Sequence, residues 1–163
     1  MIRVGILTAS DKGYRGERED LSAGVIKELV AKIDGRVESY CIVPDDRDTI
    51  KQKLLDMCGH GMDLIITTGG TGLSPRDNTP DATLEVIEKE VPGLSEAMRA
   101  EGYKKTPHAL LSRGVCGIKG STLIINLPGS PKGVRENLEV ILPAIPHGIQ
   151  VLKGKISDCG SGE

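Results

Sequence analysis

Two glycine-rich turns carry the residue types that could bind a phosphate. Gly69-Gly70-Thr71-Gly72 follows one compact apolar run directly, and Pro128-Gly129-Ser130-Pro131 follows another. Glycine lets backbone N–H groups turn toward an anion without hindrance from a Cβ atom, although a tight structural turn explains the first run equally well. The chain contains no G-x-x-x-x-G-K-[ST], and its first apolar run does not lead into G-x-G-x-x-G. ATPase switches and dinucleotide dehydrogenases are therefore disfavoured.

Charged side chains extend the first turn and a second loop. Arg76 and Asp77 precede a predicted helix, where the guanidinium could hold a phosphate and the carboxylate could hold Mg2+, or the two could simply pair with each other. Another acidic loop contains Asp45, Asp46 and Asp48, and one of these carboxylates could join Asp77 as a metal or proton-handling group. Asp46 or Asp48 is expected to cap the helix that follows. The residues alone predict an anion or nucleotide site.

The elements that must position these loops alternate between apolar strands and amphipathic helices. Strands are predicted at residues 2–8, 37–43 and 64–68, a hairpin at 114–126 turning near Lys119-Gly120, and helices at 21–33, 50–58, 92–104, 134–142 and 145–152, with a further helix capped by Thr79 and starting at Pro80. This alternation predicts an α/β fold of three αβα layers around a central, mainly parallel sheet. Ligands of such sheets bind beyond the carboxyl ends of the strands, where these loops lie.

Composition limits the class of protein. The 163 residues include 21 Gly but no Phe, no Trp and three Tyr, so the core must be aliphatic. One domain is expected at 1–156, with a flexible tail at 157–163. A net charge of −2 and the lack of rings argue against nucleic acid as a partner. No apolar run approaches the ~20 residues of a membrane helix, which favours a cytoplasmic protein without a membrane partner.

Six short segments together give a more specific signal than any one of them. They occur in a fixed order between residue 3 and about 150: Thr8-Ala9-Ser10-Asp11-Lys12, Val43-Pro44-Asp45-Asp46, Thr67-Thr68-Gly69-Gly70-Thr71-Gly72, Pro75-Arg76-Asp77-Asn78-Thr79-Pro80-Asp81-Ala82-Thr83, Leu111-Ser112-Arg113 and Asn126-Leu127-Pro128-Gly129-Ser130-Pro131-Lys132. The set resembles the MogA/MoaB family, the molybdopterin adenylyltransferases of molybdenum cofactor biosynthesis. Asn78 departs from the family, which often has Val there. Nicotinamide-mononucleotide deamidases of the CinA type fit less well, because their loop usually reads Gly-Pro-Thr-x-Asp-Asp.

The resemblance implies a nucleotidyltransferase reaction. The terminal phosphate of molybdopterin attacks the α-phosphate of Mg-ATP, which yields adenylylated molybdopterin and pyrophosphate. Asp77, on the Mg-ATP side, and Asp45, on the pterin or metal side, would be catalytic residues and Mg2+ ligands. The implied nucleotide-binding residues are Gly69, Gly70, Thr71, Gly72, Arg76, Pro128, Gly129, Ser130 and Pro131. Those implied for molybdopterin are Ser10, Asp11, Ser112 and Arg113.

The resemblance also implies partners. ATP and molybdopterin would be substrates, with no permanently bound cofactor. The protein would form a homotrimer and hand its product to a molybdenum-inserting MoeA-type protein. The alternative is a non-catalytic molybdopterin-binding or delivery protein of the MoaB type. Because aromatic rings are scarce, the ligands must be held by backbone and aliphatic walls, with Tyr14, Tyr40 or Tyr103 available to stack.

Overall fold

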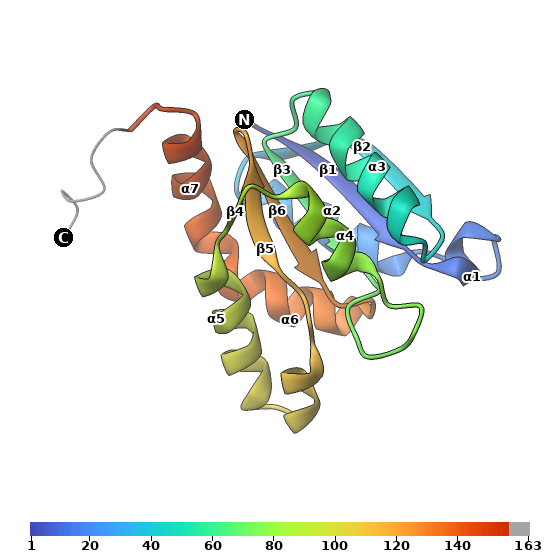
Figure 1. Ribbon diagram of the computed structural model, residues 1–163. Helices are drawn as coiled ribbons and strands as arrows, with labels where there is room; N and C mark the ends of the chain where they lie inside the picture. Colours follow the sequence, from blue (N-terminus) through green and yellow to red (C-terminus); the bar gives the residue numbers. More distant parts are fainter. Residues whose placement is uncertain (157–163) are drawn as a thin grey trace.

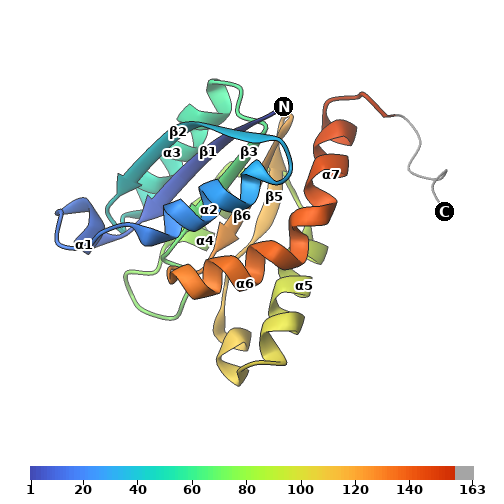
Figure 2. The same cartoon turned by 180° about the vertical axis from the view of Figure 1, so that it is seen from behind.

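Helices cover both faces of a six-stranded sheet in the computed structural model (Figures 1 and 2), which describes residues 1–156. The predicted tail, 157–163, lies outside the described residues. The elements are β1 Ile2–Ala9, α1 Asp11–Tyr14, α2 Leu21–Ala31, β2 Gly35–Val43, α3 Arg47–Gly59, β3 Leu64–Thr68, α4 Thr79–Val86, β4 Lys89–Glu90, α5 Pro92–Tyr103, the 3-10 helix η1 Pro107–Leu111, β5 Cys116–Lys119, β6 Thr122–Leu127, α6 Pro131–Ile141, η2 Leu142–Ala144 and α7 Ile145–Leu152. Between residues 1 and 156, no helix is both long and apolar enough to span a membrane.

The sheet has the order β2-β1-β3-β6-β5-β4. The first four strands are parallel, and β5 and β4 continue the sheet in antiparallel pairing, so the prediction of a mainly parallel sheet is confirmed. The predicted hairpin is also confirmed, because Lys119 pairs with Thr122. Thr68 of β3 pairs with Thr8 of β1 and with Leu127 of β6. The carboxyl ends of the three central strands are therefore level, and their loops emerge side by side.

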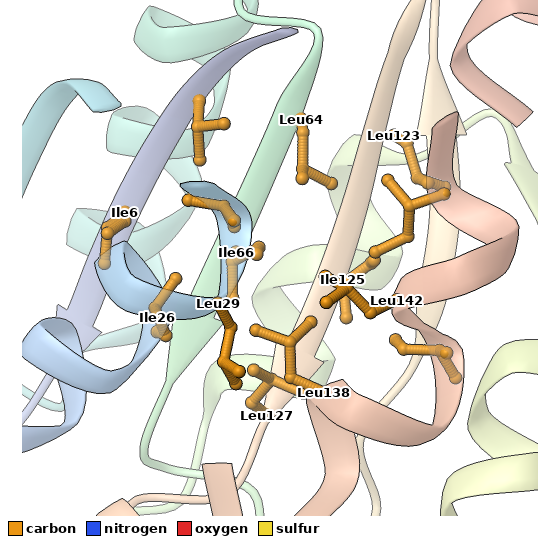
Figure 3. Close-up of a cluster of buried hydrophobic side chains, with 14 of the residues drawn as sticks. Ile6, Ile26, Leu29, Leu64, Ile66, Leu123, Ile125, Leu127, Leu138 and Leu142 are labelled. Atoms are coloured by element: carbon orange, nitrogen blue, oxygen red, sulfur yellow. The ribbon is translucent and has the colours of Figure 1, made fainter. Parts of the chain in front are cut away.

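Aliphatic side chains fill the core on both faces of the sheet. The larger cluster packs α2, α6 and α7 against residues such as Ile6, Ile66 and Ile125 (Figure 3), and the smaller packs α3 and α4 against Ile65 and Ile124. Every member of either cluster is aliphatic, Met or Cys, so the expectation of a core without rings is confirmed. Burial of each Leu or Ile side chain contributes about 1.5–3 kcal/mol relative to exposure.

One polar side chain ties the β6 end of the sheet together. Asn126 is 2% exposed, and its amide nitrogen donates to the hydroxyls of Thr67 and Thr83, each at 3.0 Å. Its carbonyl oxygen accepts the Val115 N–H at 3.2 Å. The Asn126 side chain therefore makes three hydrogen bonds inside the protein, and these connect β3, α4 and the segment before β5 to β6.

The prediction that Thr79 caps α4 is wrong. Asn78 occupies the N-cap position and Thr79 is the first residue of the helix. The reason is tertiary: the Thr79 N–H already donates to the Gly70 carbonyl at 3.1 Å, so the glycine turn holds the chain where it enters the helix. The expected cap of α3 is confirmed, since the Asp46 carboxylate accepts the Thr49 N–H at 2.9 Å.

Candidate functional site

The loops at the carboxyl ends of β1, β2, β3 and β6 enclose a cavity of about 520 Å3. Segments far apart in the sequence meet there because the strands that precede them are neighbours in the sheet. Eight of the residues predicted for the site line this first cavity: Ser10, Asp45, Gly69, Gly70, Asp77, Gly129, Ser130 and Pro131. The structure thus brings both candidate catalytic carboxylates together with residues from both glycine turns.

Glycine is required in the first turn by the close approach of other backbone segments. Gly69 and Gly70 have φ angles of +91° and +66°, in the region that side chains with a Cβ disfavour. A Cβ atom on Gly69 would overlap the carbonyl oxygen of Ala9 at the end of β1, and one on Gly70 would overlap the Thr79 hydroxyl. The Gly69 N–H donates to the Leu127 carbonyl at 3.2 Å. The close approach of Ala9 therefore explains why residue 69 is a glycine. The Gly69 N–H is bonded within the protein and is not free to bind a phosphate.

The second glycine turn is fixed by hydroxyl groups from two directions. The Thr68 hydroxyl donates to the Pro128 carbonyl at 2.7 Å, and the Ser22 hydroxyl of α2 donates to the Gly129 carbonyl at 2.7 Å. Ser130 caps α6 by accepting the Gly133 N–H at 3.0 Å. This wall of the cavity is a rigid backbone surface at a helix N-terminus.

Two aspartates interlock beside the first cavity. The Asp11 N–H donates to the Asp45 carboxylate at 2.9 Å, and the Asp45 N–H donates to the Asp11 carboxylate at 3.0 Å. Arg76 donates two hydrogen bonds to Asp11, at 2.8 and 3.1 Å, and so pairs with Asp11 rather than with Asp77. The hydrogen bond from Arg76 holds the pKa of Asp11 below its usual range. Neither Asp11 nor Arg76 lines the cavity.

Asp45 has the opposite electrostatic environment. It is half-buried, and burial raises the pKa of its carboxyl above the ordinary value, with the charges of Asp11 and Asp77 adding to the increase. Asp45, Asp77, Glu19 and Asp20 all line the cavity, against one cation, Arg18. A cation bound among these carboxylates would relieve their repulsion, which suits Mg2+. Within residues 1–156, no group of three or more His, Cys, Asp or Glu residues is placed to hold a metal ion.

Sequence reasoning missed Asp20, which also lines the cavity. Its Oδ1 accepts the Ala23 N–H at 3.1 Å and caps α2, while its Oδ2 accepts the hydroxyls of Thr8 and Tyr40, each at 2.6 Å. An aspartate immediately before a helical hydrophobic pattern is an N-cap signal that could have drawn attention to it. Its proximity to the site depends on α2 beginning next to the end of β1.

A second cavity of about 430 Å3 adjoins the first and is lined by residues of α5, η1, α6 and the end of β6. Gly72, Ser112 and Pro128 line it, and Ser130 lines both cavities. Its charged lining residues are Arg99, Lys132 and Glu136, so cations predominate, in contrast to the first cavity. Arg99 donates to the Gly114 carbonyl at 2.9 Å and thereby shapes this wall.

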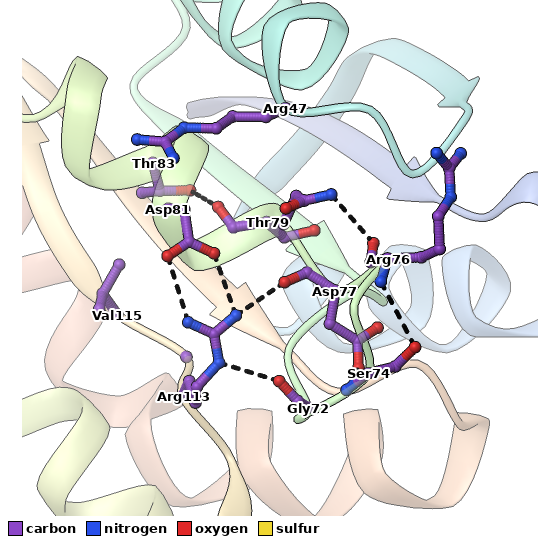
Figure 4. A network of polar contacts seen from close by, with 12 residues as sticks. Arg47, Gly72, Ser74, Arg76, Asp77, Thr79, Asp81, Thr83, Arg113 and Val115 are labelled. Carbon is purple, nitrogen blue, oxygen red and sulfur yellow. Dashed lines mark hydrogen bonds and ion pairs between the residues drawn. The ribbon is translucent and has the colours of Figure 1, made fainter.

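Arg113 lines neither cavity. Figure 4 shows its guanidinium directed at Gly72, Asp77 and Asp81. Its guanidinium donates to the carbonyl oxygens of Gly72, at 2.9 Å, and Asp77, at 2.7 Å, and to both carboxylate oxygens of Asp81, at 3.0 and 3.2 Å. Its own N–H donates to the carbonyl of Thr71, a buried residue that lines neither cavity. The hydrogen bond from Arg113 lowers the pKa of Asp81. The guanidinium is engaged by protein groups on three sides.

None of the three tyrosines contributes to the wall of either cavity. Tyr14, Tyr40 and Tyr103 are 62%, 40% and 56% exposed, and none of them lines either cavity. The cavity walls consist instead of backbone, hydroxyl, aliphatic and charged groups, with His108 in the second cavity. In this structure, any planar ligand would therefore lie against these groups rather than against a tyrosine ring.

Comparison with known proteins places the chain in a family. Residues 5–147 match the model of a probable molybdopterin binding domain. The chain is 45% identical over 156 residues to the molybdopterin adenylyltransferase of Helicobacter pylori, which covers 94% of this chain and 89% of that protein. It is 41% identical over 162 residues to gephyrin of Dictyostelium discoideum, covering 93% of this chain and 23% of gephyrin. The crystal structure of the molybdopterin biosynthesis enzyme MoaB from Thermus thermophilus superposes with a TM-score of 0.89 at 55% identity, covering 94% and 98% of the two chains. The chain therefore belongs to the MogA/MoaB family of molybdopterin-binding domains.

Proposed function

We propose that the protein is a molybdopterin adenylyltransferase of molybdenum cofactor biosynthesis, a nucleotidyltransferase that moves AMP from Mg-ATP to the terminal phosphate of molybdopterin and releases pyrophosphate. The observation that carries the proposal is the pair of adjoining cavities, of opposite charge character, that share Ser130. A transfer between two bound anions requires them side by side in fixed geometry. Relatives that match nearly the full chain, such as the one from Helicobacter pylori, have this name.

The first cavity suits Mg-ATP. Its carboxylates would repel bare phosphates, so the nucleotide must bring a divalent cation, and Asp45 and Asp77 are placed to hold it. When bound, the ion neutralises charge that develops on the phosphates during transfer. The backbone of Gly70 and of residues 129–131 would lie against the nucleotide. Ser10, assigned above to the pterin, lines this cavity and would contact the nucleotide side as well.

The second cavity suits molybdopterin. Arg99 and Lys132 provide positive charge for an anionic ligand, and Ser112 provides a hydroxyl at the wall. Ser130, at the boundary, marks where the terminal phosphate of the pterin would meet the α-phosphate of ATP. Contacts of Asp11 and Arg113 with molybdopterin, and of Thr71 and Arg76 with the nucleotide, remain predictions.

The test is a turnover assay with the purified protein, ATP, Mg2+ and molybdopterin. Pyrophosphate and adenylylated molybdopterin should appear together, and only when all three components are present. Asp77→Ala should abolish release of pyrophosphate and leave molybdopterin bound. Asp56→Ala is the matched control, because Asp56 is an exposed carboxylate of α3 that lines neither cavity. A native protein that binds molybdopterin but releases no pyrophosphate would instead be a carrier.

We also propose that the protein works in the cytoplasm as a homotrimer and passes its product to a MoeA-type protein. The chain matches 23% of gephyrin, so a related domain occurs within a longer protein, which is consistent with transfer of the product to a neighbouring domain or protein. Light scattering after gel filtration should give about three times the chain mass of 17.3 kDa. Transfer should be seen as faster consumption of adenylylated molybdopterin when a MoeA-type protein and molybdate are added.

A further inference from the structure

The loop between the glycine turn and α4 connects the two cavities. Gly72 lines the second cavity and Asp77 lines the first, five residues further along the chain. The loop closes on itself, because the Asp77 carboxylate accepts the Ser74 N–H at 3.0 Å. Gly72 packs against the same carboxylate, since a Cβ atom on Gly72 would lie 2.9 Å from an Asp77 oxygen. A shift at either end of this loop would therefore move the Asp77 carboxylate.

Arg113 holds both ends of that loop at once. Three groups accept hydrogen bonds from its guanidinium: the Gly72 carbonyl, the Asp77 carbonyl and the Asp81 carboxylate of α4 (Figure 4). Only a guanidinium has enough N–H groups in one plane to bond a carboxylate and two carbonyls together, whereas a lysine ammonium is a single point charge. Asp81 anchors the guanidinium to the first turn of α4. The loop is thereby fixed to a rigid element of the fold.

The segment that carries Arg113 forms part of the second cavity. Ser112 and Gly114, on either side of Arg113, line that cavity, and the Arg113 N–H is fixed to the Thr71 carbonyl at 2.8 Å. Arg113 therefore connects the segment that lines the second cavity, through its hydrogen bonds, to the loop that carries the Asp77 carboxylate of the first cavity. The Arg113 side chain itself lines neither cavity, and its hydrogen bonds to Gly72 and Asp77 are to the loop.

We infer that Arg113 is a positioning residue, which fixes the Asp77 carboxylate for the reaction by holding the loop of residues 72–77. The inference rests on the proposed function for its catalytic consequence, but the hold on the loop is a property of the protein without substrates. Misplacement of a positioned group by about 1 Å can reduce a rate about 100-fold. Loss of the guanidinium should therefore reduce turnover without removing either substrate site.

The test compares Arg113→Lys with Arg135→Lys. Arg135 of α6 is a matched control: its side chain is 38% exposed, against 37% for Arg113, and it also makes two hydrogen bonds to one carboxylate, that of Glu28. It lines neither cavity. In the protein without substrates, amide hydrogen exchange of the peptide covering residues 69–81 should become faster in Arg113→Lys and remain native in Arg135→Lys. Unchanged exchange in Arg113→Lys would overturn the inference.

Kinetics supply the second readout. Arg113→Lys should lower kcat about 10- to 100-fold and change the KM for ATP and for molybdopterin less than about threefold. Equal kcat values for the two lysine variants, or a KM effect alone, would contradict a positioning role.

Two situations are separated by this design. If the native protein releases no pyrophosphate, the proposed function fails, while the exchange experiment still decides whether Arg113 holds the loop. If Arg113→Lys does not fold, Asp81→Asn takes its place, because it removes the charge that anchors the guanidinium and leaves the loop sequence intact. Faster exchange at residues 69–81 is expected there too, and native exchange would overturn the inference.

Discussion

Replacing Gly69 by alanine should destabilise the protein strongly, for reasons of backbone geometry. Gly69 has a φ angle of +91°, and its added Cβ would overlap the carbonyl oxygen of Ala9. The position of the Cβ is fixed by the backbone just after β3, and the oxygen is a backbone atom at the end of β1, its paired strand in the middle of the sheet. Neither can move away as a flexible side chain would. Relief of the overlap requires the two strand ends to separate.

The magnitude follows from two contributions. The positive φ angle costs a residue with a Cβ about 1–2 kcal/mol, and overpacking of a well-packed site costs about 1–3 kcal/mol. The free energy of unfolding should therefore fall by about 2–5 kcal/mol, a large part of the about 5–15 kcal/mol typical of a domain. Gly129→Ala is the matched control in the neighbouring turn. Its Cβ would lie 3.4 Å from the Gly69 Cα, an ordinary contact, and we expect a change within about 0.5 kcal/mol.

Equilibrium unfolding in urea measures both variants. With a slope of about 2 kcal/mol per molar urea, Gly69→Ala should lower the midpoint by about 1–2.5 M, while Gly129→Ala should unfold close to the native protein. The slope should remain the same in both, because the surface exposed on unfolding does not change. A Gly69→Ala variant as stable as Gly129→Ala would refute the account of the turn, and with it the placement of the strand ends around the first cavity.

Three further predictions concern the side chains around the cavities. Asp45→Asn should raise the free energy of unfolding at pH 7, because the folded-state pKa of Asp45 is raised and its ionised form is therefore penalised; in urea titrations the gain should disappear as the pH falls below the ordinary value of about 3.9. Asp77→Asn should lower the pKa of Asp45, because it removes a neighbouring negative charge; the pKa is measured from the carbon-13 chemical shift of the Asp45 carboxyl group as the pH is varied. An unchanged pKa of Asp45 would show that the two charges do not interact. Asn126→Leu should lower the free energy of unfolding in urea by about 2–5 kcal/mol, because three buried hydrogen bonds, to the Thr67 and Thr83 hydroxyls and from the Val115 N–H, are lost and only the Thr83 hydroxyl keeps another partner, the Thr79 carbonyl. A loss below about 1 kcal/mol would contradict the network.

The main elements of the fold could be predicted because each has a strong local pattern. The apolar run of β3 and the helical spacing of α2 and α3 specify their elements whatever surrounds them, and the alternation specifies the parallel sheet. The short elements α1, β4 and η1 escaped prediction because two to five residues carry no period. The cap of α4 was mispredicted because the Gly70 carbonyl, nine residues earlier in the glycine turn, accepts the Thr79 N–H and fixes the start of that helix. A sequence pattern local to the helix does not contain this contact.

The membership of the site was more predictable than its contacts. Loops after parallel strands meet at one edge of the sheet, so the meeting of Asp45 and Asp77 follows from topology. The partners of the arginines depend on side-chain geometry across elements, which no spacing encodes. Arg76 pairs with Asp11, 65 residues away, and Arg113 with Asp81, 32 residues away. Asp20 was overlooked because its role as a helix cap hides its position beside the cavity.

Local conflicts gather around the first glycine turn, and this gives support for the site that does not depend on any motif. Burial and the neighbouring carboxylates raise the pKa of Asp45, so its ionised form is penalised there. The Thr79 hydroxyl is the one buried side-chain polar atom in residues 1–156 without a hydrogen-bond partner, and it lies against Gly70. Natural sequences are otherwise locally consistent, and departures from that consistency concentrate where function requires them. The buried Thr79 hydroxyl and the Asp45 carboxylate both lie against Gly70, at the strand ends that form the first cavity, so the two costs coincide with the proposed site.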